Sequence, residues 1–218
     1  MKTIDVFAKW LFELRFGKMK NTQHYKLVGS GAGVIACQVL NATRIRLLLS
    51  VRSAVVGEGF GITGGGFVEA GQLLNTPLRT MVETASEAYR EVDEENLKFA
   101  SVITLEEFLN RAQPIAALHV HTGDESMVHA TNFSALCVTD AEWEAISTLD
   151  GSDERSGALR EVIMTFSTDL SRMQPETGVQ LTCNGESVNV AAFYHYHELR
   201  AIAMIAWHHQ QGKLWGAT

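Results

Sequence analysis

The sequence predicts a mixed α/β fold in which one sheet lies between layers of helices. Of the 218 residues, 46% are hydrophobic and 20% are charged, which is typical of a globular chain that can bury a sizeable core. Strand patterns and helix patterns interleave irregularly along the chain, so we expect a mixed sheet rather than a repeated parallel unit. No apolar run approaches the ~20 residues that cross a bilayer. Lys9, Glu13 and Arg15 also interrupt any apolar stretch of a signal peptide.

The charge and the cysteines narrow the class of protein. A net charge of −7 with only 18 Lys and Arg argues against a nucleic-acid surface. It is compatible with a small anionic substrate, because a divalent metal can supply the positive charge. The three cysteines are far apart and form no CxxC pair, which favours a reducing, cytoplasmic location without disulfides. We therefore expect neither nucleic acid nor a membrane as a partner.

The elements follow in order from the hydrophobic pattern. Residues 1–26 carry six Lys and Arg and have apolar residues at helical spacing, which predicts an amphipathic helix that docks on the domain or on a second subunit. Strands are predicted over residues 27–40, 44–51, 99–103, 117–121, 129–138 and 161–166. Helices are predicted over residues 85–95, 105–112, 140–149 (capped by Asp140) and 188–211, the last one ended by Gly212.

Two neighbouring segments carry the chemistry. Residues 56–66 contain six glycines in eleven positions, which predicts a loop and a tight turn. On the helix that follows, one face is almost purely acidic and consists of Glu87, Glu91, Glu94 and Glu95. The opposite face can pack on a sheet and consists of Ala85, Ala88, Tyr89 and Val92.

The glutamates on this acidic face repel one another. Like charges four residues apart cost roughly 0.2–0.5 kcal/mol per pair, and the nearby cation is Arg90, at the edge of the acidic face. Clustered carboxylates suit hard divalent cations, which prefer oxygen ligands. The glycines before the helix let the backbone approach closely, so that a carbonyl oxygen can join the carboxylates around a metal.

These segments resemble the conserved box of the Nudix hydrolases. The glycines Gly64–Gly66 lead into Glu69 and Gly71, and residues 90–95 read Arg-Glu-Val-x-Glu-Glu, as that box does. The resemblance covers about residues 27–170. It implies an α/β/α sandwich with a mixed sheet, to which this chain adds N-terminal and C-terminal helical extensions.

The resemblance also implies a mechanism and a set of residues. Mg²⁺ or Mn²⁺ would be bound by helix glutamates and by one backbone carbonyl, namely Glu91, Glu94, Glu95 and Gly66. A carboxylate would take a proton from the metal-bound water, and the candidates are Glu91, Glu154 and Glu161. Arg90 would orient the box through an internal salt bridge. Arg52 and Glu69 are candidates for substrate contacts.

The chain departs from the family pattern in three places. Gln72 replaces an expected acid, about ten extra residues (roughly 73–82) precede the helix, and Asn96 and Leu97 follow it. We expect the insertion to loop out before the helix begins, with Thr84 and Glu87 as a capping box. Asn96 would end the helix in the left-handed conformation. Glu87 lies one turn before Glu91, so we predict that it replaces the missing acid at the metal.

Two rival motifs are weaker. Gly29-x-Gly31-x-Gly33 lacks the spacing of a dinucleotide-binding loop, and the residues after it continue as a strand. His119 and His121 point to one face of a strand, as in the first metal motif of cupins, but the sequence offers no convincing second half.

The sequence thus predicts a Nudix domain over residues 27–180, between an N-terminal helical extension (1–26) and a C-terminal helix (181–218) that packs on the domain or on a dimer partner. The expected function is metal-dependent cleavage of a diphosphate bond in a nucleoside diphosphate derivative. The alternative is a binding or regulatory module with the same fold and impaired catalysis, which Gln72 and the insertion favour.

Overall fold

The computed structural model describes residues 26–52, 59–68, 77–121, 127–152, 157–193 and 196–214. Its strands are β1 (Lys26–Asn41), β2 (Arg44–Arg52), β3 (Gly59–Gly61), β4 (Gly64–Val68), β5 (Gln113–His121), β6 (Met127–Cys137), β7 (Arg160–Phe166), β8 (Val179–Cys183) and β9 (Glu186–Ser187). Its α-helices are α2 (Pro77–Glu95), α3 (Leu105–Arg111), α4 (Asp140–Ser147) and α5 (Tyr196–Gln210). Short 3₁₀ helices are η1 (Phe99–Ser101), η2 (Pro175–Gly178) and η3 (Val190–Ala192). The predicted helix over residues 1–26 lies outside the described residues, apart from Lys26, which begins β1.

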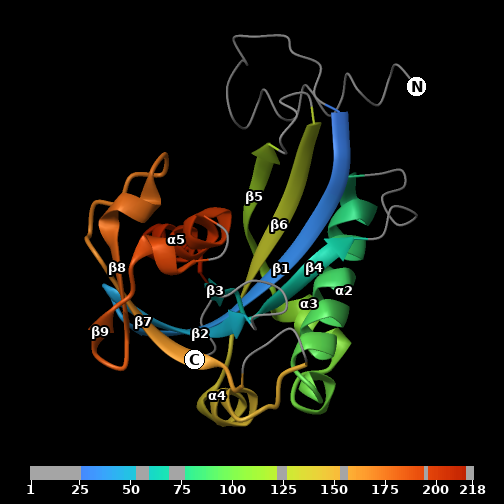
Figure 1. Ribbon diagram of the computed structural model, residues 1–218, viewed down its shortest axis with the longest axis horizontal. Coiled ribbons are helices and arrows are strands. Elements are labelled where there is room, and N and C mark those ends of the chain that lie inside the picture. Colours follow the sequence, from blue (N-terminus) through green and yellow to red (C-terminus); the bar gives the residue numbers. More distant parts are fainter. Residues whose placement is uncertain are drawn as a thin grey trace.

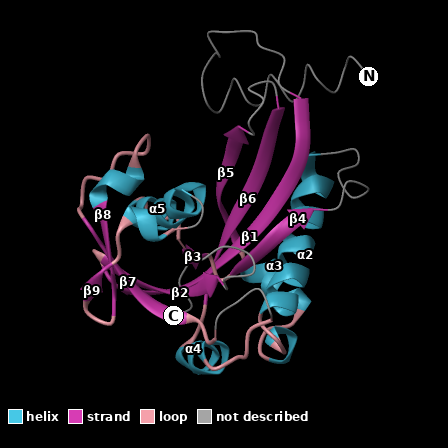
Figure 2. Cartoon of the chain, in the orientation of Figure 1, coloured by secondary structure: helices cyan, strands magenta, loops and turns pink. Residues whose placement is uncertain are grey.

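The strands form one mixed sheet in the order β5-β6-β1-β2-β7-β8-β9, with β3 paired to β2 and β4 paired to β1. Strands β1 and β6 are parallel, whereas β1 pairs antiparallel with both β2 and β4. Helices cover both faces of this sheet, with α5 on one side and α2 on the other (Figures 1 and 2). The predicted α/β/α sandwich with a mixed sheet is therefore confirmed.

The alternation of buried residues along the strands produces two cores. Because successive side chains of a strand point to opposite faces, Ile35 belongs to one core and Val34 to the other. The core on the side of α5 includes Leu47, Phe133, Leu199, Ile202 and Ile205. The core on the side of α2, α3 and α4 includes Leu48, Val92, Phe108, Trp143 and Ile146. Helix α5 thus packs on this chain's own sheet, while the predicted domain boundaries stay a prediction.

The predicted start of the acidic helix was wrong. Helix α2 begins at Pro77, so the second part of the insertion is helical, and Thr84 is buried within the helix instead of capping a new one. The sequence from Pro77 to Glu95 contains no glycine or second proline that would interrupt a helix. Proline suits the first helical position, because its missing N–H would have no partner there.

Several other predicted elements also differ. The predicted strand over residues 99–103 is a 3₁₀ turn, in which Val102 and Ile103 donate to the Phe99 carbonyl. Thr139, not Asp140, caps α4 through a capping box with Glu142. Strand β3 and the start of β4 fall in the predicted glycine loop (residues 56–66), and β8 was not predicted. The C-terminal helix begins only at Tyr196, since β9 and η3 precede it. It ends before Gly212 (φ 62°), as expected.

No helix among the described residues has the length and apolar character needed to cross a membrane.

One ion pair fixes α4 to α3, and its loss at low pH is testable. Arg111 donates to both carboxylate oxygens of Glu142 at 2.6 and 2.8 Å. These hydrogen bonds are the largest cause that lowers the pKa of Glu142 from 4.5 to about 2. A lowered pKa means that the pair stabilises the fold above about pH 4.5 and loses this effect as the pH falls towards about 2.

We expect E142Q to lower the free energy of unfolding at pH 7 by about 1 kcal/mol, after allowance for solvent screening, and by less at pH 3. Denaturant unfolding at both pH values measures this difference. The control is E144Q on the exposed side of the same helix. Equal losses of stability in E142Q at the two pH values would contradict the ion-pair account.

Candidate functional site

The glycines of β4 allow helix α2 to lie directly against the backbone of the sheet. A Cβ on Gly64 would lie 2.9 Å from Glu95 Oε2 and from a methyl group of Val92, and a Cβ on Gly66 would overlap the Glu91 carboxylate. A Cβ on Gly65 would lie 2.5 Å from the Ala32 carbonyl oxygen of β1. Real Cβ atoms do not approach other atoms so closely. The absence of side chains at these positions therefore sets the distance between the acidic face of α2 and the strand.

Direct hydrogen bonds connect the end of α2 to the turn before β4. Asn96 is buried, and its Nδ2 donates to the Thr63 carbonyl at 3.0 Å and to the Val92 carbonyl at 2.9 Å. The Thr63 hydroxyl donates to the Leu48 carbonyl at 2.5 Å and accepts from the Ala36 amide at 2.8 Å. Asn96 therefore joins the helix to two strands of the sheet through Thr63.

The predicted conformation of Asn96 was wrong. Among the described residues, the non-glycine residues with positive φ are Lys98 (72°) and Asn184 (52°), so the left-handed position after α2 is Lys98. Asn96 ends the helix through its side chain, which accounts for an asparagine at this buried position.

Two helix carboxylates lie against the glycine strand. Glu95 Oε2 accepts a hydrogen bond from the Gly65 amide at 3.1 Å. Glu91 Oε2 lies closest to the point where a Gly66 Cβ would be. The side chain of Glu91 is 17% exposed, so this region is partly open to solvent. The two acids and the Gly66 backbone are the predicted metal ligands that the structure brings together.

Arg90 joins the other acids of the helix. Its guanidinium donates to Glu87 Oε1 (2.5 and 3.0 Å), to Glu94 Oε1 (2.5 Å) and to Glu91 Oε1. The hydrogen bonds to Glu87 and then Glu94 are the main causes that raise the pKa of Arg90. The self-repulsion that the sequence indicated is therefore offset within the helix by one cation.

Glu87 is the buried member of this cluster. Its side chain is 3% exposed, whereas that of Glu94 is 60% exposed. The sequence predicted Glu87 as a metal ligand. In the structure its carboxylate contacts the Arg90 guanidinium.

The chemistry of the donors suits a hard divalent cation, but their arrangement supports one only in part. The carboxylates of Glu91 and Glu95 and the carbonyl of Gly66 are oxygen ligands of the kind that Mg²⁺ and Mn²⁺ prefer. Within the part of the chain that the structure describes, no three His, Cys, Asp or Glu side chains are grouped closely enough to bind a metal ion. Glu87, Glu91 and Glu94 all contact Arg90, but of the described acids only Glu91 and Glu95 are seen against the glycine strand. A metal between the helix and this strand would therefore depend first on Glu91, Glu95 and the backbone.

The other predicted site residues are dispersed or not described. Glu69 and Glu154, like Gln72, lie outside the described residues. Glu161 lies on β7, where its carboxylate is 3.8 Å from Arg46 Nη1. Arg52 is the last residue of β2, and its Cγ lies 3.6 Å from where a Cβ on Gly61 would be.

Sequence reasoning missed Glu198, a buried carboxylate on α5. The residue is 6% exposed, and Oε2 has no hydrogen-bond partner among the described residues. Burial is the largest cause that raises the pKa of Glu198, to about 7, and the negative charge of Glu95 raises it further. The positive charge of Arg52 and a hydrogen bond from the Ile62 amide act in the opposite direction. An acid among the apolar residues of α5 was the only signal in the sequence.

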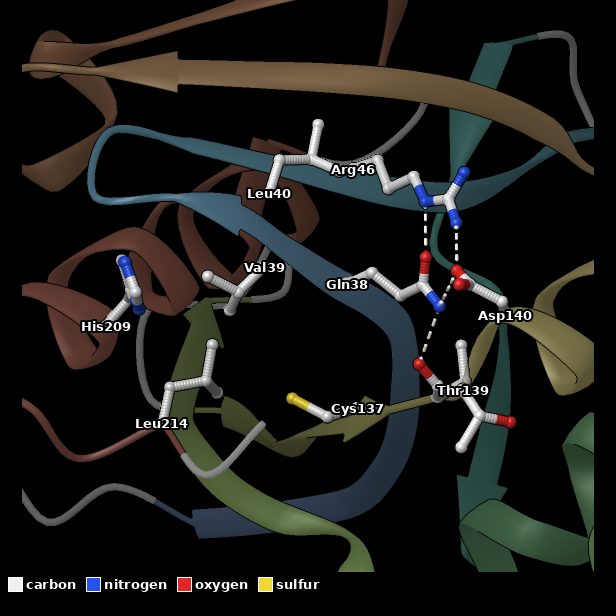
Figure 3. Close-up of a pocket in the computed structure, with 10 residues that line it drawn as sticks. Gln38, Val39, Leu40, Arg46, Cys137, Thr139, Asp140, His209 and Leu214 are labelled. Carbon is white, nitrogen blue, oxygen red and sulfur yellow. Dashed lines mark hydrogen bonds and ion pairs between the residues drawn. The ribbon is translucent and has the colours of Figure 1, made fainter. Parts of the chain in front are cut away.

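A separate cavity of about 710 Å³ lies at the β1–β2 turn and does not include these acids. Figure 3 shows Arg46, Gln38 and Asp140 joined by hydrogen bonds on one side of it, with Cys137 and Leu214 on the other. Gln38 Nε2 donates to the Val138 carbonyl at 2.8 Å, and its Oε1 accepts from Arg46. The polar groups of Gln38 are thus already used within the protein, and we assign this cavity no role in the site.

Comparisons with known proteins give a likeness at the level of solved structures. No family model matches the chain, and no curated protein matches it. It is similar to a MutT/nudix family protein from Enterococcus faecalis, at 13% identity and a TM-score of 0.47 over 92% of this chain and 68% of that one. It is similar to a NUDIX hydrolase from Nitrosomonas europaea (14%, 0.41, over 88% and 78%) and to a C. elegans Ap4A hydrolase (18%, 0.35, over 60% and 77%). Likenesses this low carry no argument about function.

The burial of Glu198 predicts a stability that depends on pH. Because the folded state raises the pKa of this acid from 4.5 to about 7, the folded chain binds the proton more tightly than the unfolded chain does. This stabilising effect is complete below about pH 4.5 and is lost as the pH rises through about 7, at a cost of about 3 kcal/mol.

We expect E198Q to be about as stable as the wild type at pH 5 and more stable than it at pH 8. Denaturant unfolding across this range measures the change, and E186Q on exposed β9 is the control. If the stability curves of E198Q and the wild type stay parallel from pH 5 to pH 8, Glu198 does not titrate in this range.

Proposed function

We propose that the protein is a Nudix-type hydrolase that cleaves a diphosphate bond in a nucleoside diphosphate derivative with the help of Mg²⁺ or Mn²⁺. The observation that carries the proposal is the contact between Glu91 and Glu95 of α2 and the glycine strand Gly64–Gly66. This contact joins the two halves of the motif that the sequence resembles, although the inserted segment separates them in the chain.

The metal ligands that we propose are Glu91, Glu95 and the Gly66 carbonyl, with the exposed carboxylate of Glu94 as a further one. A bound divalent cation would neutralise the diphosphate and lower the pKa of a water molecule on it. We propose Glu87 as the buried partner of Arg90 and not as a metal ligand, because its side chain is 3% exposed and binds the guanidinium.

The protein's own groups have defined tasks in this proposal. Arg90 keeps Glu91 and Glu94 in place through its hydrogen bonds, so that neither acid needs to reorganise before the reaction. A carboxylate takes the proton of the attacking water, and Glu154 and Glu91 are the candidates for this base. Arg52 and Glu69 are the proposed substrate contacts. A homodimer and a cytoplasmic location stay predictions from the sequence.

A second candidate function is supported by one specific observation. Among the described residues no three metal-ligating side chains converge, which favours a ligand-binding or regulatory module with impaired catalysis. A panel of nucleoside diphosphate derivatives, each assayed with Mg²⁺ and with Mn²⁺ for binding and for product release, distinguishes the two functions. The enzyme releases phosphate or mononucleotide from at least one compound, whereas the binding module binds one without cleaving it.

Loss of either carboxylate at the glycine strand should abolish turnover without loss of the fold. We expect E91Q and E95Q to lower kcat by at least about 100-fold, because each removes a charged metal ligand. The free energy of unfolding should stay equal or rise slightly, since like charges are removed from one helix face. The control is E106Q, which changes an exposed acid on α3. Full activity of the wild type in excess chelator, or of both variants, would contradict the metal mechanism.

The role of Glu87 is separable from metal binding by a double-mutant cycle. If Glu87 acts through Arg90, then E87Q and R90Q should each lower kcat/KM. The kcat/KM of the double variant should then be no lower than that of the less active single variant. The measurement is kcat/KM and the Mg²⁺ concentration for half-maximal rate in all four proteins. If E87Q shifts the Mg²⁺ midpoint by the same factor whether or not Arg90 is present, Glu87 acts directly on the metal.

A further inference from the structure

Helix α5 brings one buried carboxylate to the turn that precedes the glycine strand. Glu198 lies in the first turns of α5, next to Leu199 and near Ile202, both of which pack in the core. A residue that served only to pack the helix would be apolar there, because a buried carboxylate loses its hydration. Glu198 is 6% exposed, and its Oε2 has no hydrogen-bond partner among the described residues. The arrangement costs stability, so packing does not explain it.

The hydrogen bond that Glu198 does accept points to a purpose. Its donor is the backbone amide of Ile62. Two residues later begins β4, where the Gly65 amide donates to Glu95. Between them, the Thr63 carbonyl accepts from Asn96. Residues 62–65 are therefore held by hydrogen bonds to α5 on one side and to the C-terminal end of α2 on the other.

The surroundings of Glu198 also include Arg52. If Gly61 carried a Cβ, that atom would lie 3.5 Å from Glu198 Oε2 and 3.6 Å from Arg52 Cγ. The Arg52 guanidinium and the Glu95 carboxylate are the charged groups whose electrostatic effects reach Glu198. Glu198 thus lies within electrostatic range of a proposed substrate contact and of a proposed metal ligand.

We propose that Glu198 is a positioning residue of the site. By accepting the hydrogen bond of the Ile62 amide, it fixes the Ile62–Gly66 segment, and with it the places of Gly65 and Gly66 relative to Glu95 and Glu91. Its influence on rate rests on the proposed function, whereas its influence on the backbone does not. The C-terminal helix, which lies outside the motif, is in this way a part of the site.

The test compares three variants. E198L removes the hydrogen-bond acceptor and keeps a side chain suited to the core, and E198Q keeps an oxygen acceptor without the charge. L199A is the matched control, because it weakens the packing of the same helix at the neighbouring buried position. The first readout is hydrogen exchange at the amides of Ile62 and Gly65, and the second is kcat and KM on any compound that the wild type hydrolyses.

The proposal predicts exchange at these amides at least about tenfold faster in E198L and close to the wild type in E198Q and L199A. The kcat of E198L should fall about tenfold or more with KM within about threefold, while E198Q keeps most of the rate. L199A should lower the melting temperature without this local effect.

Wild-type protection of both amides in E198L would overturn the proposal. So would an E198Q that is as impaired as E198L, because the charge rather than the acceptor would then matter. If E198L does not fold, E198M decides the same question, and failure of both to fold would mean that Glu198 is required for the fold and not for positioning. A wild type that hydrolyses no compound refutes the proposed function, and the exchange rates still decide the role of Glu198.

Discussion

The site depends on the close approach of an acidic helix face to a strand without side chains. Any side chain at Gly64, Gly65 or Gly66 would meet Val92 and Glu95, the β1 backbone or Glu91. The glycines therefore do more than permit a turn, because they allow carboxylates to lie against the strand backbone, where the Gly65 amide donates to Glu95. The Asn96–Thr63 hydrogen bond then fixes the helix along the strand. The glycine strand and the carboxylates of α2, which belong to one sequence motif, therefore lie together although an inserted segment separates them in the chain.

The carboxylates on this face of α2 repel each other, and an arginine on the same helix offsets part of this repulsion. Four glutamates on one helix face repel each other, and Arg90 at 43% exposure contacts three of them. The Glu87 carboxylate is buried and is paired with the Arg90 guanidinium. The side chain of Glu94 is exposed and that of Glu91 is partly exposed, so a cation can reach the acidic face. The helix therefore carries both the charges that a metal needs and the cation that makes them tolerable without one.

Much of the fold could be predicted from the sequence because apolar runs bounded by turn residues mark the strands and apolar residues at helical spacing mark the helices. Val92 lies in the core, as its place opposite the acidic face predicted, and Ile35 and Leu47 are buried in strands that the sequence predicted. The errors have physical causes as well. Phe99 and Ile103 are as buried as strand residues, but their backbone bonds are local. The early start of α2 and the side-chain role of Asn96 depend on contacts that a single sequence does not contain. Glu198 was missed because nothing in a local pattern connects α5 to Ile62, 136 residues earlier in the chain.

The proposed function requires a divalent cation to bind between the acidic face of α2 and the glycine strand. The most direct measurement is a crystal structure of the protein with Mn²⁺, in which the anomalous signal of the metal locates it independently of its ligands. We expect a peak within bonding distance, about 2.0–2.3 Å, of carboxylate oxygens of Glu91 and Glu95. A peak at His119 and His121, or none near α2 at saturating Mn²⁺, would contradict it.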